Sequence, residues 1–168
     1  MLTSKKLQRS LRSSQIIFVT TGGNDLVHFL RDNIILDDQK LLTDKFNSYA
    51  VGYQKRVNKL LTNIHQKNKT AKVFVIGIYN PVYVSFPQVS FINQSVVKQN
   101  AITEKTVNSH QGMYFVSVNT QLSDGQYQSK KSQDLLKKHS ETVNSQGQLT
   151  AAAVEGILNG NLANSNKY

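Results

Sequence analysis

The segment Ile16-Ile17-Phe18-Val19-Thr20-Thr21-Gly22-Gly23-Asn24-Asp25 is the part of the sequence that decides the fold. Its first four residues form an uninterrupted apolar run, and two threonines and two glycines follow at once. A short run of this kind is typical of a buried parallel strand that ends in a loop. The sequence therefore predicts a strand whose carboxyl end carries the Gly-Gly-Asn-Asp loop.

The spacing of the apolar residues further along the chain predicts helices alternating with strands. After the loop, apolar residues recur at helical spacing, and we expect Asp25 to help cap that helix. A second apolar stripe steps by four and three residues, as one face of a long amphipathic helix does. The predicted elements are helices at 26–33, 42–64, 89–107 and 149–157, strands at 73–78 and 113–118, and a weakly amphipathic basic helix within 2–12.

This alternation predicts a single α/β domain over residues 1–158, followed by a polar tail at 159–168. Right-handed crossovers between parallel strands place helices on both faces of such a sheet. The stretch 119–148 is rich in Ser, Gln, Lys and Gly, so we expect a long loop with one helical turn around 134–138.

Ligands of open parallel sheets bind beyond the carboxyl ends of the strands. This rule singles out three loops of the sequence, at 20–25, 79–86 and 119–126.

The composition excludes several kinds of site. Cysteine is absent, which rules out disulfides, thiolate metal sites and a cysteine nucleophile. The four histidines show no short metal-ligand spacing, so we expect neither a metal nor a cofactor. No apolar run approaches the roughly 18 residues of a membrane span. The basic start of the chain lacks the apolar core of a secretory signal, so a cytoplasmic location is expected if Met1 is the true start.

The formal net charge of +10 makes a polyanionic partner worth considering. The lysines, however, occur singly or in pairs, and the sequence contains no recognised nucleic-acid module. We therefore favour a basic solvated surface over a nucleic-acid site.

The Gly-Gly-Asn-Asp loop has a possible chemical use. Gly22 and Gly23 would let the backbone approach a ligand closely, and the side-chain amide of Asn24 can donate a hydrogen bond to a developing oxyanion. Taken alone, the same residues are also good chemistry for a tight turn.

Three segments in series resemble the SGNH/GDSL family of lipases and acylhydrolases from Gram-positive bacteria. Residues 16–33 resemble a conserved block of that family, and 73–81 and 113–125 are similar to its next two strands. The resemblance implies a three-layer, flavodoxin-like fold, an acyl-ester or lipid substrate, and Asn24 as an oxyanion-hole side chain. Relatives are often membrane-anchored outside the cell.

The sequence also departs from the family in its catalytic residues. It contains no Gly-Asp-Ser, the motif that carries the serine nucleophile. In the best register Thr142 stands where the family has its catalytic histidine, and His139, three residues earlier, is a weak candidate base. We therefore expect a truncated hydrolase that is inactive alone. The alternatives are a non-catalytic binding protein on this scaffold and an esterase half completed by an upstream polypeptide.

Two interpretations remain open for the second loop. Tyr79, Asn80, Tyr83 and Phe86 either line a substrate pocket beside Asn24 or pack the turn between strand and helix.

The resemblance also predicts an incomplete sheet. A flavodoxin-like sheet has the strand order 2-1-3-4-5, and the three strands here match the last three, so the N-terminal side is missing. The edge of Ile16 to Thr20 would then be unpaired. We expect the isolated chain to be marginally stable, to self-associate through this edge or to depend on an upstream fragment.

Overall fold

The computed structural model describes residues 4–33, 39–81, 83, 90–125, 127 and 129–139. In chain order the elements are α1 (Lys5–Ser13), β1 (Ile16–Thr20), α2 (Gly23–Asn33), α3 (Gln39–Lys67), β2 (Lys72–Ile76), α4 (Ser90–Asn108), β3 (Met113–Val116), α5 (Asn119–Ser123) and α6 (Lys130–His139). This order confirms the predicted α/β class.

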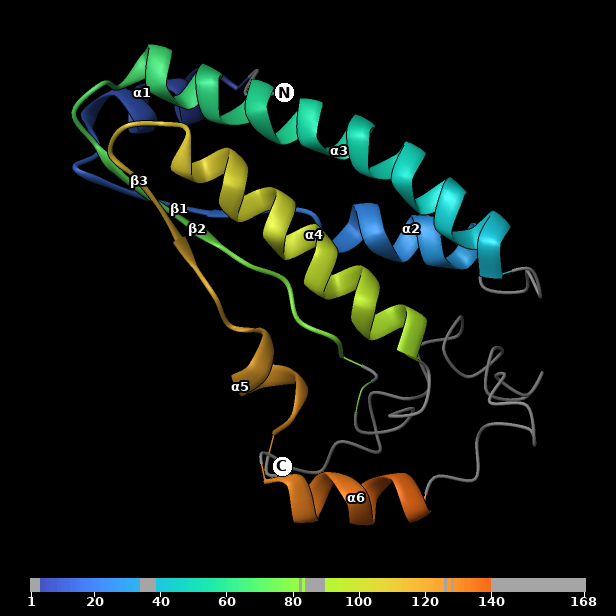
Figure 1. The fold of residues 1–168 in the computed structure, drawn as a ribbon. Helices are drawn as coiled ribbons and strands as arrows, with labels where there is room; N and C mark the ends of the chain where they lie inside the picture. Colours follow the sequence, from blue (N-terminus) through green and yellow to red (C-terminus); the bar gives the residue numbers. More distant parts are fainter. Residues whose placement is uncertain are drawn as a thin grey trace.

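The three strands form one parallel sheet in the order β1-β2-β3, as Figure 1 shows. The register places Phe18 beside Phe74, and Phe74 beside Tyr114, in one row across the sheet. Two neighbouring parallel strands must be joined by a crossover connection, usually a helix. Helices α2 and α3 connect β1 to β2, and α4 connects β2 to β3. The predicted parallel sheet is therefore confirmed.

The core lies between one face of the sheet and the helices α1, α3 and α4. Alternate strand residues point into it, because successive side chains of a strand face opposite sides. The buried strand residues are Ile17, Val73, Val75 and Met113. Helices α3 and α4 run side by side over this inner face (Figure 1). On the opposite, outer face Phe18 is 71% exposed and Ile16 is 54% exposed. The sequence predicted helices on both faces, whereas the described helices cover only the inner one.

The long helix α3 carries the predicted apolar stripe through its whole length. Its buried members are Leu42, Phe46, Tyr53, Val57 and Ile64. The predicted Tyr49 and Leu60 are partly buried, and Leu61, which was not predicted, is fully buried. A second cluster forms where the first half of α3 meets α2 and α4, around Leu26, Phe29 and Phe46. These aromatic and aliphatic contacts fix α2, and with it the Gly-Gly-Asn-Asp loop, against the two long helices.

The prediction of a long loop from 119 was too extensive, because α5 and α6 lie within it, whereas the helical turn predicted at 134–138 is part of α6. Lys and Gln are good helix formers, so a polar composition does not by itself indicate a loop. The strands β2 and β3 also end two residues earlier than predicted, at Ile76 and Val116. The helix predicted at 149–157, the domain end at 158 and the tail at 159–168 lie outside the described residues.

Candidate functional site

The Gly-Gly-Asn-Asp loop connects the carboxyl end of β1 directly to the amino end of α2. The carbonyl of Gly22 accepts a 3.0 Å hydrogen bond from the N–H of Leu26, so the first helical turn starts at this carbonyl. Asn24 is exposed in that turn. The first N–H groups of a helix have no acceptor within the helix and point outward from its positive end. Asn24 therefore adds a side-chain donor to a backbone that already presents donors.

Gly22 occupies a position where only glycine fits. Its φ of +97° is a conformation that residues with a side chain rarely adopt. A Cβ at Gly22 would also overlap the Tyr53 hydroxyl and lie 2.5 Å from Nε2 of Gln99. The loop thus packs its backbone directly against side chains of α3 and α4.

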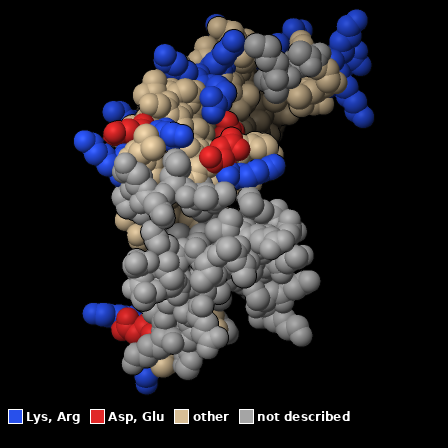
Figure 2. Space-filling view, turned by 90° about the vertical axis from the view of Figure 1, so that its right-hand side faces the viewer, with Lys and Arg blue, Asp and Glu red and all other residues tan. Residues whose placement is uncertain are grey.

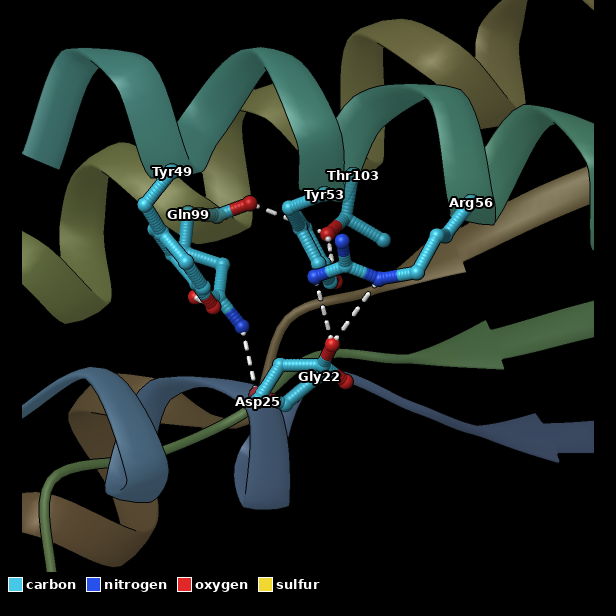
Figure 3. A network of polar contacts seen from close by, with 7 residues as sticks. All are labelled: Gly22, Asp25, Tyr49, Tyr53, Arg56, Gln99 and Thr103. Carbon is cyan, nitrogen blue, oxygen red and sulfur yellow. Dashed lines mark hydrogen bonds and ion pairs between the residues drawn. The ribbon is translucent and has the colours of Figure 1, made fainter.

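A buried glutamine holds this loop to α4, as Figure 3 shows. Gln99 is fully buried, and its Nε2 donates to the Gly22 carbonyl at 2.7 Å. Its Oε1 accepts a 2.6 Å hydrogen bond from the Tyr49 hydroxyl on α3. The Gly22 carbonyl is therefore fixed from the core side by a chain of two hydrogen bonds.

Tyr53 and Thr103 form a second buried pair behind the loop. Oγ1 of Thr103 donates to the carbonyl of Gln99 at 2.9 Å, so the 2.8 Å contact with Tyr53 is donated by the tyrosine hydroxyl. Desolvation raises the pKa of Tyr53 and, more strongly, that of Tyr49, because a phenolate would lose its hydration in this interior. Both phenols are therefore fixed as hydrogen-bond donors at neutral pH.

The raised pKa values of Tyr49 and Tyr53 predict a loss of stability in alkali. Below pH 10.0, the ordinary tyrosine pKa, both phenols are neutral in the folded and unfolded chain. Above it the unfolded chain loses these protons first, so the free energy of unfolding falls with pH, by about 1.4 kcal/mol per unit for each tyrosine. Urea unfolding at pH 9 and pH 11 measures the fall, and the double variant Tyr49→Phe/Tyr53→Phe should show a shallower one. If the free energy of unfolding fell equally with pH in both proteins, Tyr49 and Tyr53 would not be the cause of the fall.

Asp25 pairs with an arginine across the loop rather than capping α2 as predicted. Its Oδ1 accepts hydrogen bonds from Nε and one terminal nitrogen of Arg56, at 3.1 and 2.7 Å (Figure 3). The Arg56 side chain is 58% exposed and that of Asp25 33%. Ion pairs this accessible contribute little, typically below about 1 kcal/mol. The pair orients the loop, while Gln99 supplies the buried attachment.

The carboxyl end of β2 is shaped by side chains from α4 and α5. Asn100 accepts from the Ile78 N–H at 2.9 Å and donates to the Ile78 carbonyl at 2.7 Å, in the manner of a neighbouring strand. The N–H of Asn80 donates to Ser123 Oγ at 2.7 Å, and Asn80 is 2% exposed. These hydrogen bonds fix the backbone of Ile78 and Asn80, where the chain leaves β2 and the second loop begins.

These strand ends surround a cavity of about 840 Å³. Asn24, Gly22, Gly23 and Tyr79 line it together, although they come from two different loops. Much of the remaining wall is apolar and is formed by Leu26, Val27, Leu30, Ile76, Ile78, Ile92, Val96, Val118 and Leu122. The cavity thus lies beyond the carboxyl ends of the parallel strands, where ligands of such sheets bind.

The other predicted site residues lie elsewhere or outside the description. Among the described residues Asn80 is buried in the turn and is not part of the cavity wall. Tyr83 is partly buried, and desolvation, followed by the nearby Asp124, raises its pKa. His139 is the last residue of α6, and its side chain lies outside the described part, as do Phe86 and Thr142.

The arrangement can hold an apolar group and donate hydrogen bonds to an oxygen at its mouth. In the described part of the chain no three His, Asp or Glu side chains come together as metal ligands. Burial raises the pKa of Asp124, on the third predicted loop. The described site thus places the Asn24 side chain and the Gly22-Gly23 backbone on the wall of a largely apolar cavity.

The charged side chains are spread over the described surface. On the face shown in Figure 2, Lys and Arg project at several separate places, and Asp or Glu lie beside some of them. No helix within the described ranges is long and apolar enough to cross a bilayer.

The residues that sequence reasoning missed are the polar members of α4. Gln99, Asn100 and Thr103 are 0%, 9% and 2% exposed. Gln99 and Thr103 continue the apolar stripe of Ile92 and Val96 at helical spacing. Polar residues at core positions of a helix are a signal of a buried hydrogen-bond network.

No profile of a known protein family matches the chain. It is similar to YpmR, an uncharacterized protein of Bacillus subtilis (strain 168), with 32% identity over 104 residues. The similar region covers 62% of this chain and 39% of the length of YpmR. Since YpmR is itself uncharacterized, the activity and substrate of this chain are proposals.

Proposed function

We propose that the chain is the C-terminal part of an SGNH/GDSL-type ester hydrolase, a lipase or acylhydrolase, that is inactive alone. One observation carries the proposal: Asn24 and the Gly22-Gly23 backbone line the same apolar-walled cavity at the carboxyl end of the sheet. An acyl chain would occupy the apolar part, and Asn24 would donate to the oxyanion that forms during acyl transfer.

The strand order supports the finer fold assignment within this proposal. A flavodoxin-like sheet of order 2-1-3-4-5 has its last three strands as contiguous neighbours. The observed order β1-β2-β3 agrees with that half of such a sheet. The resemblance of residues 16–33, 73–81 and 113–125 to the family falls on these strands and the loops after them.

The chemistry that the chain lacks follows from its sequence. Gly-Asp-Ser is absent, and Thr142 takes the place of the family's histidine. A serine hydroxyl needs a base, usually a histidine, to attack an ester. We therefore expect the purified chain to hydrolyse a short-chain acyl ester no faster than buffer, and turnover by the chain alone would contradict this part of the proposal.

Binding of a tetrahedral anion tests the role of Asn24 independently of turnover. Octylphosphonate combines an alkyl chain with an anionic tetrahedral head, and octanol has the chain without the charge. A hydrogen bond to a charged group is worth about 1.5–3 kcal/mol. Asn24→Ala should therefore weaken octylphosphonate binding about tenfold or more, measured by titration calorimetry, and leave octanol binding unchanged.

The control for this measurement is Asn58→Ala, which removes an exposed asparagine from α3. It should bind both ligands as the unmodified chain does. Equal loss of both ligands in Asn24→Ala, or no loss of either, would refute Asn24 as the oxyanion donor.

A specific observation favours a second candidate, an esterase half completed by an upstream polypeptide. In the described residues β1 has one hydrogen-bonded neighbour, β2, so its other edge is open to a further strand. An open edge also permits self-association. We expect sedimentation of the purified chain alone to show oligomers. When a Gly-Asp-Ser-bearing fragment is added, we expect the chain to become monomeric and active.

A monomer that melts cooperatively at high temperature without any added fragment would contradict the open edge. Reading the coding DNA before Met1 for Gly-Asp-Ser, in frame or after a disruption, separates a shortened gene from a complete one. Ligand binding without turnover, even with such a fragment present, would instead favour a non-catalytic binding protein on the same scaffold.

A further inference from the structure

The wall of the cavity beyond the strand ends contains an arginine as well as the oxyanion donor. Arg31, in the last turn of α2, lines this cavity together with Asn24. The other charged side chain of the wall is Asp25, whose carboxylate is paired with Arg56 at 2.7 Å. Within the described ranges Arg31 has no ion-pair partner. The cavity wall therefore carries one uncompensated positive charge.

Arg31 lies on the same side of α2 as Asn24. Asn24, Val27 and Arg31 follow one another at intervals of three and four residues, which places them along one side of a helix. All three are exposed and line the cavity. Seven residues of helix rise about 10 Å, so this distance separates the positions of Asn24 and Arg31 along the helix axis.

The surface between the two polar side chains is apolar. Val27 and Leu30 lie between Asn24 and Arg31 on α2 and also line the cavity, and Val27 is 57% exposed. An alkyl chain lying on this surface would remove it from water, which is favourable. A guanidinium binds a carboxylate or a phosphate through two parallel hydrogen bonds. This side of α2 is thus complementary to an alkyl chain that carries an oxyanion at one end and a second anion at the other.

We propose that the ester bound in this cavity carries a second anionic group, a carboxylate or a phosphate, and that Arg31 binds it. This group would lie about 10 Å from the ester carbonyl at Asn24. Since Asn24 enters here as the oxyanion donor, the role of Arg31 rests on the proposed function, and it narrows the substrate class to anionic esters. The net charge of +10 also attracts such a ligand from a distance.

Three phosphonates test the second anion and its place in the ester. Octylphosphonate ends in a methyl group. In 8-phosphonooctanoate a carboxylate ends the alkyl chain, on the acyl side of the tetrahedral group. In the 6-carboxyhexyl monoester of methylphosphonate, a carboxylate lies on the alcohol side. The two carboxylates lie at a similar distance from the phosphonate, so the pair distinguishes an anionic acyl chain from an anionic alcohol.

Arg31→Gln should weaken the binding of one of the two carboxylate ligands about fivefold, measured by titration calorimetry, as expected for an accessible ion pair. Whichever ligand responds assigns the anion to the acyl chain or to the alcohol. Octylphosphonate should bind to this variant as it does to the unmodified chain, which also shows that the variant is folded. The matched control is Arg9→Gln, which removes an exposed arginine from α1, outside the cavity wall. It should bind all three ligands as the unmodified chain does.

Two results would overturn the role of Arg31. If Arg31→Gln bound both carboxylate ligands as tightly as Arg9→Gln, Arg31 would not contact the second anion. If it weakened octylphosphonate as much as the carboxylate ligands, Arg31 would bind the phosphonate itself. Asn24→Ala separates these results from the proposed function: if it weakens octylphosphonate, Asn24 remains the oxyanion donor even where Arg31 fails. If the unmodified chain binds none of the three ligands, both proposals fail.

Discussion

Replacing Gly22 by alanine is expected to lower the free energy of unfolding by about 4 kcal/mol. Two costs combine: the strain of a side chain at φ +97°, and the overlap of its Cβ with Tyr53 and Gln99. Each is of the order of 1–3 kcal/mol. Urea denaturation followed by circular dichroism measures the change as a lower midpoint with the same slope.

Gly23→Ala is the matched control for this variant. The nearest atom to a Cβ at Gly23 is Cγ2 of Ile78 at 3.9 Å, an ordinary contact, and the residue begins α2. Its stability should change by less than about 0.5 kcal/mol. If both variants lost the same stability, glycine content in general and not the packing of Gly22 would be the cause.

Replacing Asn68 by alanine is expected to cost about 3 kcal/mol of stability, although the residue lies far from the cavity. Asn68 is 8% exposed and directly follows α3. Its Nδ2 donates to the carbonyls of Leu11 and Ser14, both at 2.8 Å, and its Oδ1 accepts from the N–H groups of Thr70 and Ala71, at 3.1 and 2.9 Å. Alanine would leave several of these backbone groups without a partner, at about 1–3 kcal/mol each when buried.

The control for Asn68 is again Asn58→Ala, on the exposed surface of α3. Alanine is the best helix former, so this control should be neutral or slightly stabilising. Thermal melting of the three proteins gives the comparison. A melting temperature for Asn68→Ala equal to that of the control would show that water replaces the lost contacts and that Asn68 does not join α1 to the sheet.

Gly22 and Asn68 differ in how much of their role the sequence could predict. The position of Gly22 was predictable, because two glycines after a short apolar run mark a loop at a strand end. That Gly22 faces Gln99, 77 residues away, was not predictable from local pattern. No local sequence pattern indicates the buried contacts of Asn68, because a single asparagine after a helix is equally typical of an exposed turn.

The sequence by itself determined the strands, the long helices and the parallel α/β arrangement, because apolar periodicity is a local property that burial imposes on each element. It also determined that Asn24 follows a strand end and that no Gly-Asp-Ser is present. Only the tertiary structure decided that Asn24 and Tyr79 share one cavity, and that Phe18 lies on an exposed face while Ile17 lies in the core. The physical reason is that a continuous apolar run suits either face of a strand, and contacts between distant segments leave no periodic trace in the chain.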